Sequence, residues 1–375
     1  MTPFFSVLLD LIRALSAFVV ALAHLSFLSY RGEFKDCLVW AAHPAVIIFF
    51  VLSGYVIAFS CYTKHTNFHG YTLARLVRLY PVYLTALVLI PILDFFGRNN
   101  APGLYINYPY PSLEFIGLIY LFFLQELDVF NSIKYFSDGP LWSLSYEFWY
   151  YIFFGLIVYY YKSIFKSKLI VLIFVILGLS IFLRIILLFP AWLCGVVLYD
   201  LTTNKKIKLS PSLCLYGCLL SGIVFVGIVF PSPLEHFITQ MTFRFQLLLS
   251  TELAFSSTYI RDYLIGCTFA IFLFFAEQTT RRQDFASSFM GLFLKNNLSK
   301  SLIKTFSGFS YTLYALHVPL ILFMSSFYLF DSHSLTHQFI ILVLIYLITF
   351  ILSFWLERPN KKILNKIYTV LKITP

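Results

Sequence analysis

The stretch that decides the fold runs from Leu9 to His24 and reads LDLIRALSAFVVALAH. It is apolar enough for a membrane helix, yet it carries Asp10, Arg13 and His24. In a helix, residues three apart are neighbours, and Arg13 and His24 share a face over roughly 16 Å, about three turns. Ionisable side chains in hydrocarbon are expensive and normally face a protein interior or a water-filled cavity. The stretch therefore predicts a membrane protein with a polar path or site inside it.

The whole chain has the composition of a polytopic membrane protein. Of its 375 residues, 60% are hydrophobic, 20% are aromatic and 12% are charged, whereas soluble domains carry about a quarter charged residues. The N-terminus lacks the basic region of a signal peptide, so we expect the first helix to be retained. The six cysteines show no CxxC or Cys/His spacing and are interpreted as small buried hydrophobic residues.

Apolar runs of suitable length predict an all-α polytopic membrane protein with about ten transmembrane helices. The expected spans are 8–29, 43–61, 75–96, 141–161, 168–186, 187–200, 209–230, 261–277, 306–330 and 337–357. The run 115–124 is too short to cross, so the region near 113–125 is predicted to be a re-entrant or interfacial segment. Pro190 is expected to mark the turn within the pair 168–186 and 187–200.

The net charge of +10 indicates topology rather than binding to nucleic acid. With ten spans, most of the 27 Lys and Arg residues fall on one side of the membrane. Such an excess is typical of cytoplasmic loops, so both termini are predicted to be cytoplasmic. We expect a single integral-membrane domain over 1–375, a long outer loop at 97–140 and a short basic cytoplasmic tail at 358–375.

The polar stripe of the first span has two interpretations. Arg13 is either a cation that reaches toward the headgroups beside Asp10 or a charge that lines a cavity. His24 lies near the outer end of the same face. A lone membrane histidine more often makes a hydrogen bond between helices, but a neutral imidazole can also accept the proton of a hydroxyl nucleophile.

A second group of charged residues lies at the cytoplasmic start of the span 75–96, where Arg75 and Arg78 share a face. They are either an ordinary basic anchor or a guanidinium clamp for phosphates, which suits the fork geometry of arginine. His65 and His69 precede them, but no third ligand lies nearby, so a metal site is rejected.

Two further polar groups fall within predicted spans. Glu147 lies about two turns inside its span, and a carboxylate in the membrane is a functional candidate by default. Tyr311, Tyr314 and His317 recur at helical spacing in another span, and Pro319 is expected to loosen the helix there. These three residues are either a polar contact between helices or the lining of a cavity.

Taken together, these stretches resemble the acyltransferase 3 family, bacterial integral-membrane O-acyltransferases with a ten-helix core. The resemblance extends from about Asp10 to Pro359. It is carried by Arg13 and His24 with ten residues between them, FFVLSGYVI (49–57), Arg75-x-x-Arg78-Leu79-x-Pro81, LWSLSYEFWYY (141–151), Arg184 followed by FPAWLCG, SYTLYALHVP (310–319) and LERP (356–359). The family's first helix usually reads Asp-Gly-Leu-Arg-Gly, and here both glycines are replaced.

The resemblance implies an O-acyltransferase of the bacterial inner membrane. It would move an acyl group, usually acetyl, from cytoplasmic acyl-CoA to a hydroxyl of a surface or lipid-linked glycan such as the O-antigen of lipopolysaccharide or an exopolysaccharide. His24 is implied as the catalytic base, and Glu147 as a catalytic residue that orients His24 or the acceptor. The residues implied to bind substrate are Asp10, Arg13, Arg75, Arg78, Ser145, Tyr311 and His317. Acetyl-CoA would be a co-substrate, and we expect no permanently bound cofactor and no metal.

Three alternatives stay open. The same family could use succinyl, or a lipid, peptidoglycan or antibiotic hydroxyl as acceptor. A transporter or flippase could use the polar stripe as a permeation path, although transporters often have internal repeats, and we find none in the sequence. A structural membrane subunit would not need Arg, Glu and His inside the membrane.

Overall fold

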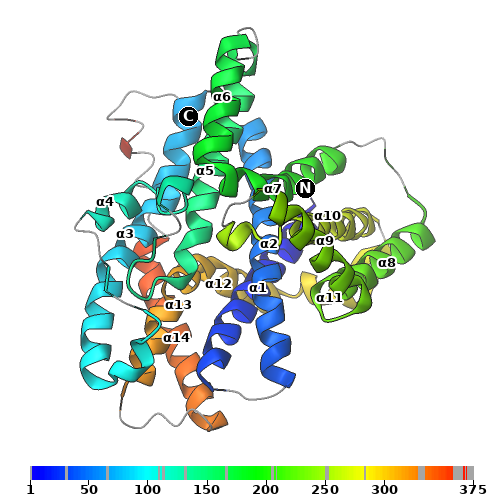
Figure 1. The fold of residues 1–375 in the computed structure, drawn as a ribbon. Coiled ribbons are helices and arrows are strands. Elements are labelled where there is room, and N and C mark those ends of the chain that lie inside the picture. Colours follow the sequence, from blue (N-terminus) through cyan, green and yellow to red (C-terminus); the bar gives the residue numbers. More distant parts are fainter. Residues whose placement is uncertain are drawn as a thin grey trace. The chain divides into compact units, whose positions relative to one another are not determined.

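In the computed structural model, the protein is built from helices (Figure 1). It describes residues 2–29, 33–64, 67–108, 110–111, 115–130, 133–164, 168–203, 207, 209–249, 253–282, 284–327, 334–357, 366–367 and 369. All regular elements within these ranges are helices, which confirms the predicted all-α class. Most of the basic tail predicted at 358–375 lies outside the described residues.

Eight helices of the described chain are long and apolar enough to cross a membrane. They are α1 (Pro3–Ser29), α2 (Glu33–Lys64), α3 (Phe68–Asn100), α5 (Trp142–Ile164, whose apolar span is Gly139–Tyr161), α7 (Leu183–Thr203), α8 (Pro211–Val229), α10 (Tyr259–Thr280) and α14 (Leu335–Leu356). Counted as one span, α12 (Asn297–Gly308) and α13 (Ser310–Ser325) add a ninth. The remaining predicted span corresponds to α6 (Lys168–Ile181), which has 14 residues and is shorter than predicted.

Two predicted helix boundaries are wrong. Pro190 does not mark a turn, because it lies inside α7, and the break after α6 falls at Phe182. A proline is tolerated inside a membrane helix where neighbouring groups satisfy the carbonyl that it leaves without a donor. The span predicted at 306–330 is divided at Phe309, between α12 and α13, whereas Pro319 lies within α13.

Several short or amphipathic elements were not predicted from the sequence. They are α9 (Pro233–Leu249), α11 (Phe289–Lys295) and the 3-10 helices η1 (Pro102–Tyr105), η2 (Asp128–Phe130), η3 (Gly139–Leu141), η4 (Ala254–Ser256) and η5 (Asp284–Ser287). Within the predicted segment 113–125, the helix α4 (Ile116–Leu121) has six residues. Six residues span only about 9 Å, so α4 does not cross a membrane, in agreement with the prediction.

The chain divides into two compact units. Unit 1 contains Met1–Val20, Cys37–Ser60 and Leu187–Ser310, and unit 2 contains Ala21–Asp36, Cys61–Ile186 and Tyr311–Pro375. The helices α1, α2, α7 and, by its first residue, α13 therefore contribute residues to both units.

In unit 1, α2 and α7 pack backbone against backbone. A Cβ atom added at Gly195 would lie 2.0 Å from the carbonyl oxygen of Val51, and one added at Gly54 would lie 2.2 Å from that of Trp192. Small residues allow this approach in membrane helices, and both glycines belong to motifs that the sequence singled out. The core beside them consists of Phe5, Leu9, Val51, Leu52, Tyr55, Leu198, Phe269 and Leu273.

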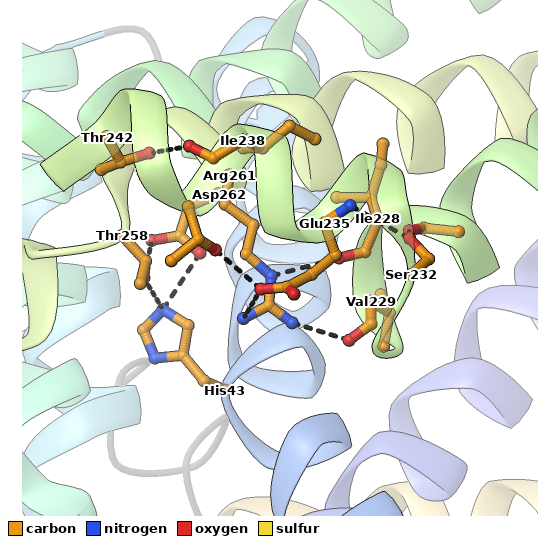
Figure 2. Close-up of polar contacts among 12 residues, drawn as sticks. His43, Ile228, Val229, Ser232, Glu235, Ile238, Thr242, Thr258, Arg261 and Asp262 are labelled. Carbon is orange, nitrogen blue, oxygen red and sulfur yellow. Dashed lines mark hydrogen bonds and ion pairs between the residues drawn. The ribbon is translucent and has the colours of Figure 1, made fainter. Parts of the chain in front are cut away.

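Also in unit 1, Arg261 connects the helix ends of α8, α9 and α10 (Figure 2). Its Nε donates to the carbonyl of Ile228 at 3.1 Å, and its Nη2 donates to that of Val229 at 2.6 Å. Its Nη1 lies 3.9 Å from a carboxylate oxygen of Glu235 at the start of α9. The last carbonyls of α8 lack helical donors, so the guanidinium both caps that helix and fixes the start of α9.

Beside Arg261, a buried carboxylate joins α2 to the start of α10 (Figure 2). Nε2 of His43 lies 3.1 Å from Oδ1 of Asp262, and the hydroxyl of Thr258 donates to Oδ2 of Asp262 at 3.0 Å. Asp262 is fully buried. Because a buried carboxylate without partners would destabilise the fold, these contacts keep α2 and α10 together.

In unit 2, the predicted loop 97–140 is held against α3 by hydrogen bonds. The hydroxyl of Tyr83 donates to the carbonyl of Tyr120 at 2.8 Å. The carboxylate of Asp94 accepts the backbone N–H of Ser137 at 2.9 Å and its hydroxyl at 2.5 Å. Arg98 lies 3.5 Å from the same carboxylate. These contacts fix the approach of the chain to α5, which carries several of the candidate site residues.

Candidate active site

Two histidines that are far apart in the sequence meet in unit 2. His24 lies near the end of α1 and His317 lies in α13, and Nε2 of His317 is 3.2 Å from Nδ1 of His24. Their rings make an edge contact with centroids 4.8 Å apart. His317 is buried and His24 is half-buried. The sequence predicted both residues as candidates, but it gave no indication that they are partners.

His317 is anchored by its own helix. Its Nδ1 lies 2.8 Å from the carbonyl oxygen of Tyr314 and 3.2 Å from that of Leu313. The hydroxyl of Tyr314 makes a hydrogen bond of 2.6 Å with that of Ser143, so this part of α13 is also tied to α5. All of these side chains are buried, which restricts the rotation of the His317 ring.

Four charged or hydroxyl side chains in unit 2 interact electrostatically with Arg78, and we call this group, together with Arg78, the Arg78 cluster. The charges of Glu147 and Glu357 act on the Arg78 guanidinium, and so do the hydroxyl groups of Tyr151 and Tyr311. The hydroxyl of Tyr151 donates to Oε1 of Glu147. The cluster therefore brings together α3, α5, α13 and the residue that follows α14.

Glu357, like Tyr151, is a member of this cluster for which the sequence analysis predicted no role. Its Oε1 accepts the backbone N–H and the hydroxyl of Thr312, at 2.9 and 2.5 Å. The hydroxyl of Tyr311, the residue before Thr312, donates to the carbonyl of Leu79 at 3.1 Å. The only sequence signal for Glu357 was its place in the LERP motif, as an acidic residue at the end of an apolar helix.

Arg75 and Ser145, both predicted to bind substrate, are buried. The Arg75 guanidinium lies over the ring of Tyr71, 5.8 Å from its centroid. The hydroxyl of Ser145 donates to the carbonyl of Phe123 at 2.7 Å. Phe123 has a φ of 56°, which is uncommon for a residue with a side chain, and the bond from Ser145 helps to hold it there.

Asp10 and Arg13 lie in unit 1. Nη1 of Arg13 is 3.4 Å from Oδ1 of Asp10, as the spacing predicted. The hydroxyl of Ser307, at the end of α12, donates to the same Oδ1 at 3.2 Å and is 3.5 Å from Nη1 of Arg13. The sequence did not identify Ser307 as a partner. The helix α1 is unbroken over both Arg13 and His24, as predicted.

Chemically, unit 2 contains a nitrogen base, carboxylates, a guanidinium and hydroxyl donors on α1, α3, α5 and α13 and at the end of α14. Such groups suit proton transfer to and from a hydroxyl and the stabilisation of a developing oxyanion. Among the described residues, no group of three or more His, Cys, Asp or Glu side chains is placed to hold a metal ion.

The fold and these intramembrane groups define a polytopic membrane protein with a buried polar site. A family model described as an acyltransferase domain matches residues 7–358, nearly the whole chain. The protein therefore belongs to the acyltransferase 3 family, as the motifs predicted, and it is a membrane acyltransferase. Comparisons with curated proteins and with solved structures return no significant match.

Proposed function

We propose that the protein transfers an acyl group, acetyl being the expected one, from cytoplasmic acyl-CoA to a hydroxyl of a surface or lipid-linked glycan. O-antigen and exopolysaccharide are the expected acceptors, and the bacterial inner membrane is the expected location. The observation that carries the proposal is the contact between His24 and His317, at 3.2 Å, in helices of a membrane acyltransferase. It supplies a positioned base, which a hydroxyl nucleophile requires.

The proposed reaction needs one proton acceptor. His24 takes the proton of the glycan hydroxyl while the hydroxyl oxygen attacks the thioester carbonyl. The C–S bond then breaks, and the CoA thiolate receives the proton from His24, so that the products are the O-acyl ester and free CoA. A thiolate leaves readily, and the main demands on the protein are deprotonation of the hydroxyl and stabilisation of the oxyanion.

The remaining candidates are assigned to substrate binding. Arg75 and Arg78 are proposed to hold the phosphates of CoA at the cytoplasmic end of α3, because guanidinium groups match phosphate geometry. Arg13, with Asp10, is proposed to orient the donor. Glu147, which accepts a hydrogen bond from Tyr151, is proposed to orient the acceptor hydroxyl.

Mass spectrometry of surface polysaccharide tests this function. Polysaccharide is compared among four strains. They are cells that express the protein, cells from which the gene is deleted, and deletion cells that carry the gene either for the wild type or for His24→Gln. An added mass of one acetyl group per repeat only with the wild type supports the proposal. An added mass of one succinyl group would show that the protein transfers succinyl and not acetyl. Identical polysaccharide in all four strains would contradict the proposal that the acceptor is a glycan.

A further inference from the structure

We infer that His317 is a positioning residue that determines which nitrogen of His24 carries the lone pair. The inference rests on the proposed role of His24 as the base, because only that role gives the choice of nitrogen a chemical consequence. The hydrogen bonds of the two rings fix the positions of the protons, and these positions can be measured without an activity assay.

The first step concerns Nδ1 of His317. This nitrogen lies 2.8 Å from the carbonyl oxygen of Tyr314 and 3.2 Å from that of Leu313. A carbonyl oxygen can only accept a hydrogen bond, so Nδ1 must carry a proton and donate it. An unprotonated Nδ1 would place its lone pair against two oxygen lone pairs inside the protein, which is unfavourable.

The second step concerns Nε2 of His317. In a neutral imidazole, one nitrogen is protonated and the other is an acceptor. Since the proton is on Nδ1, Nε2 of His317 is an acceptor. This Nε2 lies 3.2 Å from Nδ1 of His24, so Nδ1 of His24 must supply the proton of that contact. The neutral His24 then carries its lone pair on Nε2.

This tautomer is the one that a base needs. The proton of the acceptor hydroxyl would be taken by Nε2 of His24, while Nδ1 holds the ring in place through His317. When Nε2 gains a proton, the ring becomes cationic and its bond to His317 becomes charge-assisted, and therefore stronger. His317 would thus orient the His24 ring and fix its tautomer. A metal-bound histidine is fixed in the same way by the acceptor that binds the N–H of its second ring nitrogen.

The test is nitrogen NMR of the protein in lipid bilayers with ¹⁵N-labelled histidine. The chemical shift separates protonated from unprotonated ring nitrogens, and coupling across the N–H···N bond identifies the pair. The chain has eight histidines, so the His24 and His317 signals are assigned from the spectra of His24→Gln and His317→Gln. The expected wild-type result is Nδ1 protonated in both rings, with Nε2 unprotonated in both.

Two substitutions of His317 form a matched pair. His317→Gln retains a carbonyl oxygen that can accept from Nδ1 of His24, whereas His317→Leu fills the space without an acceptor. We expect Gln to keep the His24 tautomer and Leu to abolish the preference for it. In acyl transfer, Leu should lower kcat by at least about tenfold with little change in KM for acyl-CoA, and Gln should restore much of the loss.

A control separates this effect from general packing. Tyr314→Phe removes the hydroxyl that binds Ser143 but leaves the backbone carbonyl that anchors His317. It should leave the His24 tautomer unchanged. A merely structural His317 would instead leave the tautomer unchanged in His317→Leu as well, and that result would overturn the inference.

Other outcomes are equally decisive. A wild-type spectrum with Nε2 of His24 protonated, or with His317 doubly protonated, would overturn the inference even if His317→Leu fails to fold. If the tautomer is as expected but His24→Gln still transfers acyl groups, the hydrogen-bond assignment holds and the proposed base role fails. The two failures are therefore distinguishable.

Discussion

One carboxylate oxygen of Glu357 accepts both the backbone N–H and the hydroxyl of Thr312, at 2.9 and 2.5 Å. Thr312 lies in the first turn of α13, where backbone N–H groups have no helical partner. A carboxylate at this place also interacts favourably with the helix dipole. Glu357 therefore caps α13 from the end of α14, and the capped helix carries Tyr311, Tyr314 and His317.

The cap makes Glu357 important for stability. Glu357→Ala should reduce the free energy of unfolding by about 1–3 kcal/mol, because it leaves buried donors without an acceptor. Glu357→Gln, which keeps a carbonyl oxygen, should lose less. Thermal unfolding in detergent measures both, and equal midpoints for Ala and the wild type would refute the capping role.

His24 is expected to be essential for acylation. Both His24→Ala and His24→Gln should lower the transfer rate by about 10²–10⁴, since Gln can hydrogen-bond but cannot take up the proton. Acylated polysaccharide is quantified by mass spectrometry at matched protein levels, and binding of CoA should persist. Near-normal acylation by a well-expressed His24→Gln variant would show that His24 is not the base. Glu147 or His317 would then be the next candidate for the base.

Arg75 and Arg78 are expected to bind CoA. Replacing both with Ala should weaken CoA binding by at least about tenfold, since each charge-assisted hydrogen bond contributes roughly 1.5–3 kcal/mol. Calorimetry on the purified protein gives the affinity, and Arg244→Ala, at an exposed position, is the control for the loss of an arginine charge. Because Arg78 lies among carboxylates, thermal unfolding must accompany the titration. Unchanged affinity in a folded double variant would rule out the phosphate clamp.

The predicted topology places the loop 97–140 outside. In a chain whose six native cysteines are replaced, Val129→Cys should react with an impermeant thiol reagent on intact cells with a permeabilised outer membrane. Val129 is 68% exposed within the protein. Tyr62→Cys, 59% exposed near the end of α2, should react only after the inner membrane is broken. If Tyr62→Cys reacts on intact cells and Val129→Cys reacts only after the inner membrane is broken, the predicted topology is reversed.

Gly195 is expected to tolerate no side chain. Gly195→Ala should destabilise the protein by about 1–3 kcal/mol, because the new Cβ would lie 2.0 Å from a backbone oxygen of α2. Gly222→Ala is the control: it lies in α8, has nothing within 4 Å of its added Cβ, and should be neutral or stabilising by about 0.5–1 kcal/mol. Equal unfolding midpoints for both variants would disprove the close packing of α2 and α7.

The sequence by itself determined the fold class, most membrane helices and the identity of the candidate residues. Apolar runs and the spacing of charges are local properties, so they can be read along the chain. Asp10 and Arg13 are an example, because three residues of helix bring them together wherever the helix lies.

Local sequence patterns did not predict the helix boundaries where contacts with neighbouring elements determine the backbone conformation. The helix α7 continues through Pro190, as membrane helices can, and α12 is divided from α13 at Phe309 rather than at a proline. The helix α9 escaped prediction because its residues are too polar to form an apolar run.

Only the tertiary structure decided which candidates are partners. His24 and His317 are 293 residues apart, and Glu357 meets Thr312 across 45 residues. Hydropathy and helical periodicity describe each helix alone and say nothing of which faces meet. That choice depends on close packing between helices, such as the approach that Gly195 and Gly54 allow, and on the need of buried polar groups for hydrogen-bond partners.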